Sequence, residues 1–150
     1  MKILIKSLRD ALAFVPNDDT YAIRIHDSKI YCDYSTLQQS SQYLFIRDYT
    51  FDAIDYHDEV SNCAIAIDDS ISKQIITDFQ KGLHCSTLLI HCRYGENRSP
   101  SVAMALNDIF NLGDNSHLIA LNYPRYVRYV YQKIMDSASD IGYSNHFSRR

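Results

Sequence analysis

The feature that most constrains the fold of this chain is the segment HCRYGENRS at positions 91–99, which separates a strand-like run from a helix-like run. The preceding residues, 87–90, form a short apolar run that is typical of a buried parallel strand. In the run that follows, Val102, Leu106 and Ile109 fall on one face of a helix. The sequence therefore predicts that a strand, a tight loop and a helix follow one another directly here.

The residue types in this loop are suited to binding a phosphate group against a thiolate. Loop amides that lead into a helix N-terminus converge on an anion, and the helix dipole favours negative charge there. The same position can lower a cysteine pKa from about 8.5 to roughly 3.5–7.5, so we expect Cys92 to be ionised. Arg98 can bind two phosphate oxygens at once, and Ser99 can donate a hydrogen bond to the thiolate. The predicted catalytic residues in the loop are Cys92, Arg98 and Ser99, and the predicted phosphate-binding residues are Arg93, Tyr94, Gly95, Glu96, Asn97 and Arg98.

The pattern His-Cys-x-x-Gly-x-x-Arg-Ser resembles the signature of the protein tyrosine phosphatase superfamily, and every fixed position of that signature is present at 91–99. Residues 20–27 and 51–55 are also similar to small bacterial dual-specificity-phosphatase-like proteins. The resemblance implies a cysteine-dependent phosphatase that forms a cysteinyl-phosphate intermediate and needs no metal or other cofactor. It implies a phosphorylated protein or peptide as substrate, carrying phosphotyrosine, phosphoserine or phosphothreonine.

The resemblance further implies an upstream aspartic acid that protonates the leaving oxygen, a contribution worth roughly 10²–10⁴ in rate. Ala53 stands where the family has this aspartate. We predict that Asp55 or Asp52 supplies the proton instead. A chain without this acid would be a slow enzyme, or an inactive pseudophosphatase that binds phosphorylated ligands.

Residues 96–100 bear on which class of substrate the protein would act on. The pair Asn97-Arg98 is similar to RNA 5'-triphosphatases of the same superfamily, but Ser99-Pro100 differs from their Thr-Gly ending. An RNA triphosphatase therefore remains an alternative to a protein phosphatase. We expect Glu96 to face away from the bound anion, because a carboxylate pointing inward would repel a phosphate dianion.

The rest of the chain predicts a single phosphatase-like domain over residues 1–150. Strand-like and helix-like patterns alternate, which favours an α/β fold with a central, mostly parallel sheet flanked by helices. Ser70 is a candidate N-cap for the helix before the loop, and Gly113 lies near the expected end of the helix after it. We predict strands at 2–6, 21–26, 43–49 and 87–91, helices at 8–14, 70–83, 101–110 and 124–136, and a helical turn at 118–121.

Composition and cysteine spacing indicate which binding partners and which cellular compartment to expect. The net charge of −3 gives no general attraction to nucleic acid or to an anionic membrane, and no long hydrophobic stretch is present. The tyrosine- and arginine-rich stretch 123–131 is interpreted as a helix whose buried stripe is Val127, Val130 and Ile134, rather than as a nucleic-acid surface. The cysteines lack metal-ligand spacing, and a catalytic thiolate needs reducing conditions. We therefore expect action in the cytoplasm, either of the producing cell or of a host cell, and no metal site.

Overall fold

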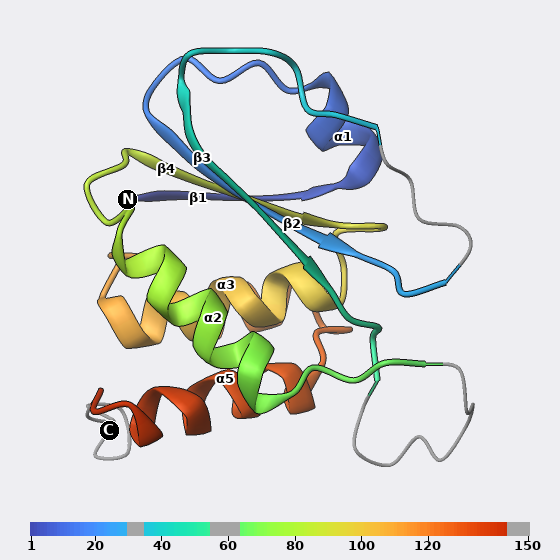
Figure 1. Cartoon of the computed structure of the whole chain (residues 1–150), viewed down its shortest axis with the longest axis vertical. Coiled ribbons are helices and arrows are strands. Elements are labelled where there is room, and N and C mark those ends of the chain that lie inside the picture. The colour runs from blue at the N-terminus through green and yellow to red at the C-terminus, as the bar shows by residue number, and fades with distance from the viewer. Residues whose placement is uncertain (30–34, 55–63, 144–150) are drawn as a thin grey trace.

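The computed structural model describes residues 1–29, 35–54 and 64–143, which contain both strands and helices (Figure 1). The strands lie in one parallel sheet with helices against both faces, which confirms the predicted α/β class. No helix in these ranges is long and apolar enough to cross a membrane. The elements are β1 (Lys2–Ser7), α1 (Leu8–Ala13), β2 (Thr20–His26), β3 (Tyr43–Thr50), α2 (Asp69–Gln80), β4 (Thr87–Cys92), α3 (Arg98–Phe110), α4 (Ser116–Asn122) and α5 (Arg128–Asp140).

The strand that precedes the loop lies inside the sheet, whose order is β1-β4-β2-β3. Its residue Ile90 pairs with Ile5 of β1 and with Ile23 of β2. All six residues of β4 are buried, as expected for a parallel strand that is covered on both faces. The carboxyl end of β4, where the loop begins, is therefore flanked by the carboxyl ends of β1 and β2.

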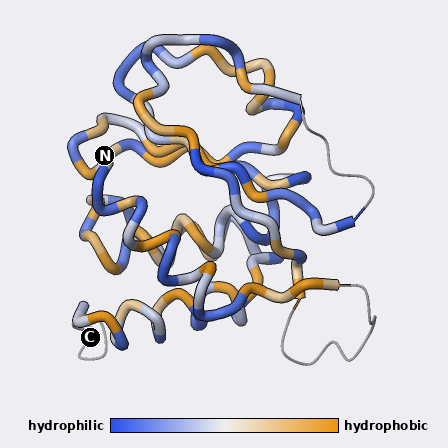
Figure 2. Tube along the Cα trace, in the orientation of Figure 1, coloured by the Kyte–Doolittle hydropathy of each residue, from blue (hydrophilic) through white to orange (hydrophobic). Residues whose placement is uncertain are grey.

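The two faces of the sheet are covered unequally. Helices α2, α3 and α5 lie together on one face, and α1 lies on the other (Figure 1). Alternate strand residues divide accordingly: Ile90 belongs to the large core cluster beneath α2, α3 and α5, whereas Leu89 packs with Ala11 in the small cluster beside α1. Apolar and hydrophilic residues are interleaved along the helices, as the hydropathy colouring shows (Figure 2).

Several predicted helix boundaries are wrong. Helix α2 is capped by Asp68, whose side chain accepts from the Ile71 backbone N–H, and not by Ser70. Helix α3 begins at Arg98 instead of position 101, because Pro100 is tolerated in a first turn, where its missing N–H costs no intrahelical bond. The end of α3 at Phe110 is as predicted, and its C-cap residue Asn111 adopts the left-handed conformation with φ of 55°.

The last helix begins later than predicted, at Arg128 rather than at position 124. The Val127 backbone N–H donates to the Ser101 hydroxyl at 2.7 Å and also points at the Asn97 carbonyl at 3.4 Å. These contacts tie the residues before α5 to the start of α3. Val127, Val130 and Ile134 are buried, which confirms the predicted apolar stripe.

Candidate active site

The loop runs from Cys92, the last residue of β4, to Arg98, the first residue of α3, at the carboxyl edge of the sheet. Ligands commonly bind at this edge in open α/β sheets. The loop is attached to the end of β1, since Ser7 pairs with Cys92 and the Leu8 backbone N–H donates to the Arg93 carbonyl at 3.1 Å. Its conformation therefore depends on β1 as well as on the two elements that it joins.

Gly95 is required at its position for two independent reasons. Its φ of 70° lies in the left-handed region, which L side chains rarely adopt. A Cβ atom there would also stand 2.6 Å from the Lys6 carbonyl carbon and 2.7 Å from the Ser7 nitrogen, both backbone atoms. The glycine thus lets the loop lie directly against the end of β1.

The thiol of Cys92 is almost completely buried, with 2% of the residue exposed, and its Sγ lies 3.1 Å from the Ser99 hydroxyl oxygen. Burial by itself raises the pKa of this thiol. Hydrogen bonds from the hydroxyl and backbone N–H of Ser99, the positive charge of Arg98 and the Gly95 backbone N–H together outweigh burial, so the pKa of Cys92 is lower than usual. The arrangement favours a thiolate.

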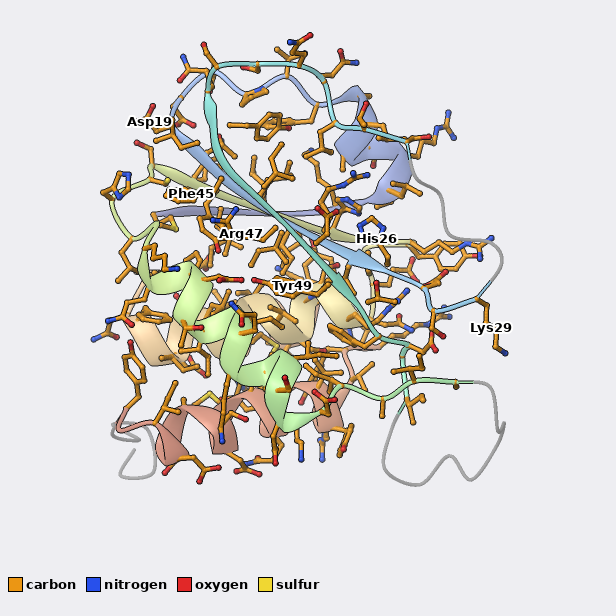
Figure 3. The ribbon with its side chains drawn as sticks, in the orientation of Figure 1. Asp19, His26, Lys29, Phe45, Arg47 and Tyr49 are labelled. Carbon is orange, nitrogen blue, oxygen red and sulfur yellow. The ribbon has the colours of Figure 1, made fainter. Side chains whose placement is uncertain are left out.

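His91 directly precedes the nucleophile Cys92 and contacts its backbone. Arg24 Nε donates to His91 Nε2 at 3.0 Å, so the ring carries its proton on Nδ1, which lies 3.3 Å from the Cys92 carbonyl oxygen. Burial is the main cause that lowers the pKa of His91 to about 4, and the Arg24 charge lowers it further. His26, at the end of β2 (Figure 3), faces the His91 ring edge-on at 6.4 Å. His91 is therefore neutral and orients the Cys92 backbone.

The guanidinium of Arg98 is buried, with 5% of the residue exposed, and is held by two partners. Its Nη1 donates to the Phe51 carbonyl at 2.8 Å, and its Nη2 lies 2.5 Å from Asp27 Oδ1. Its Nε is shielded from solvent and has no hydrogen-bond partner among the described residues. Sequence reasoning did not select Asp27 as a site residue and missed this contact. The signal available for it was the position of Asp27 directly after a strand predicted to lie in the same sheet as β4.

These groups border a cavity of about 210 Å³. Cys92 and Arg98 both line it, so a ligand in the cavity could touch the thiol and the guanidinium together. Glu96 is absent from the described lining; its side chain is exposed and lies 3.5 Å from Arg125 in an ion pair. The described lining residues are Asp27, Ala53, Cys92, Arg93, Tyr94, Asn97 and Arg98.

The two aspartates predicted to supply a proton are placed differently. Asp52 accepts hydrogen bonds from the Ser28 backbone N–H at 3.0 Å, from the Ser28 hydroxyl, and from the Ile65 backbone N–H at 2.8 Å. Burial raises the pKa of Asp52, but these bonds and the nearby Arg98 charge lower it more, so its pKa is below the usual value. Asp55 lies outside the described residues. The role of either residue as acid stays a prediction.

Comparisons of the chain with protein-family models, curated proteins and solved structures find no match. Within residues 1–29, 35–54 and 64–143, no group of three or more His, Cys, Asp or Glu side chains is placed to hold a metal ion. A thiol of lowered pKa and a buried guanidinium that share a cavity can bind an oxyanion and present a nucleophile to it.

Proposed function

We propose that this protein is a cysteine-dependent phosphatase that hydrolyses phosphotyrosine, phosphoserine and phosphothreonine in proteins. The observation that carries the proposal is the Cys92 thiol, which has a lowered pKa and lines one cavity with the Arg98 guanidinium. The spacing of these residues on a strand, a loop and a helix supports phosphate as the ligand, because the first amides of α3 and the loop can bind its oxygens.

In the first step, the Cys92 thiolate attacks phosphorus in line with the leaving oxygen. The S–P bond forms as the P–O bond to the substrate breaks, and the leaving oxygen takes a proton from an acid. Arg98 and the loop amides stabilise the charge on the three equatorial oxygens. In the second step, water attacks phosphorus and the S–P bond breaks. The deprotonated acid of the first step takes the proton from this water, and inorganic phosphate and the Cys92 thiolate are released. Ser99 assists by donating a hydrogen bond to the departing thiolate.

A second candidate function is supported by the residues around Ala53. Ala53 lines the cavity and carries no acidic group, while the Asp52 carboxylate is engaged by Ser28 and Ile65. If Asp55 does not supply the proton, the protein is a pseudophosphatase that binds phosphorylated ligands with little or no turnover. Loss of general acid catalysis lowers a rate by roughly 10²–10⁴.

The test is hydrolysis of para-nitrophenyl phosphate in the presence of a chelator and a reductant. We expect the wild type to release nitrophenolate, and we expect Cys92→Ser to abolish release, because an alcohol is a far weaker nucleophile here than a thiolate. Cys85→Ser is the matched control, since Cys85 is a buried cysteine that does not line the cavity. Activity retained in Cys92→Ser would refute the mechanism, and inactivity of the wild type would favour the pseudophosphatase.

The substrate class is tested separately, by comparing a phosphotyrosyl, a phosphoseryl and a phosphothreonyl peptide with RNA that ends in a 5'-triphosphate. We expect turnover of all three peptides, as the resemblance to dual-specificity-phosphatase-like proteins implies. Preferential removal of the terminal phosphate from RNA would replace the protein substrate by the RNA alternative. Strict preference for phosphotyrosine would contradict dual specificity.

A further inference from the structure

The contacts of Arg98 show an unusual division of its donors. One nitrogen, Nη1, is bound to the Phe51 carbonyl and serves to anchor the side chain. The opposite edge of the guanidinium carries Nη2, which is paired with Asp27, and Nε, which is buried and lacks a partner in the described part of the chain. Buried polar groups are nearly always hydrogen-bonded, so an unpaired Nε requires an explanation.

The edge formed by Nη2 and Nε is the kind of edge that binds a phosphate through two parallel hydrogen bonds. In the structure Asp27 takes one of these two donors, and Asp27 lines the same cavity as Cys92. A carboxylate oxygen at 2.5 Å from Nη2 stands where a phosphate oxygen would bind. A phosphate bound at this edge would satisfy Nε as well, which Asp27 does not do.

We propose that Asp27 is a built-in competitor for the phosphate-binding edge of Arg98 and thereby limits the affinity of the site for oxyanions. This inference rests on the proposed function for its ligand, the phosphate group of substrate and product. Substrate binding then includes the displacement of Asp27 from Nη2. After hydrolysis, the return of Asp27 to Nη2 helps to release inorganic phosphate.

The electrostatics explain why such a competitor is present. A buried guanidinium without a counter-ion is strongly unfavourable, so the Asp27 carboxylate stabilises Arg98. Asp27 also has an alternative cation close by, because its Oδ2 lies 3.5 Å from Nη1 of Arg93, whose side chain is 47% exposed. The Asp27 carboxylate can therefore leave Arg98 without losing all of its ionic partners.

The test is sulfate binding, measured as the increase in unfolding temperature across a sulfate series at constant ionic strength, balanced with chloride. A ligand that binds only the folded state stabilises it in proportion to RT ln(1 + [L]/Kd), so destabilised variants can still be compared. We expect Asp27→Asn to bind sulfate about tenfold or more tightly than the wild type, since a like charge beside the anion is removed. We also expect a lower unfolding temperature for this variant without sulfate. Asp27→Ser is the second variant and should behave in the same way.

The matched control is Asp19→Asn, which removes the same charge just before the opposite end of β2 (Figure 3) and should leave sulfate affinity unchanged. Unchanged or weaker binding in both Asp27 variants would overturn the inference, because Asp27 would then be a support that holds Arg98 in place. Absence of sulfate binding in every protein would overturn the inference and the phosphate site together. Tighter binding in a protein that hydrolyses nothing would leave the inference standing and refute the enzyme alone.

Discussion

Replacing Gly95 by alanine should be one of the most damaging single-methyl changes in this protein. The left-handed backbone conformation at φ of 70° costs an L residue about 1–2 kcal/mol. The added Cβ would also overlap the backbone of Lys6 and Ser7 at 2.6–2.7 Å, and neither atom can turn aside as a flexible side chain would. Overpacking of this kind costs typically about 1–3 kcal/mol. We therefore expect Gly95→Ala to lower the free energy of unfolding by about 2–5 kcal/mol.

The measurement is urea unfolding at neutral pH, with Gly113→Ala as the matched control. Gly113 also has a positive φ, of 95°, but a Cβ there meets nothing within 4 Å. The control therefore carries the backbone strain without the overlap and should lose only about 1–2 kcal/mol. Equal losses in the two variants would refute the claim that the loop is pressed against the end of β1.

The remaining predictions concern two side chains of the site. The rate at which iodoacetamide alkylates Cys92 should have its pH midpoint below that of an ordinary thiol, and Ser99→Ala should move this midpoint upward. Cys85, whose pKa is raised by burial, is the internal control. Identical midpoints for Cys92 and Cys85 would contradict the electrostatics. The pKa of His91 is about 4 in the folded state and 6.5 ordinarily, so between these pH values the unfolded chain binds a proton at His91 that the folded chain does not. The free energy of unfolding is therefore highest above pH 6.5 and falls as the pH drops towards 4. The loss in free energy of unfolding, measured with urea, should approach about 3 kcal/mol and should be smaller in His91→Asn. If the dependence of this free energy on pH is unchanged in the variant, the pH dependence belongs to another group.

The fold class was predictable because each signal for it is local. Alternating strand and helix patterns imply a parallel sheet with helices on its faces, and the apolar run before Cys92 indicates a strand covered on both sides. Helix ends were predicted less well. Asp68 rather than Ser70 caps α2, and Val127 is held by the start of α3, so the first turns of these helices depend on which side chain reaches which backbone group.

The candidate site divides in the same way. The proximity of Cys92, Arg98 and Ser99 could be predicted from the sequence, because all three lie in one short loop and the first turn of the helix that follows it. The contacts of Asp27 with Arg98 and of Arg24 with His91 could not be predicted from the sequence and follow from the folded arrangement of the strands. The physical reason is that β2 and β4 are neighbours in the sheet although a long stretch of sequence separates them, and no local pattern encodes which strands will pair.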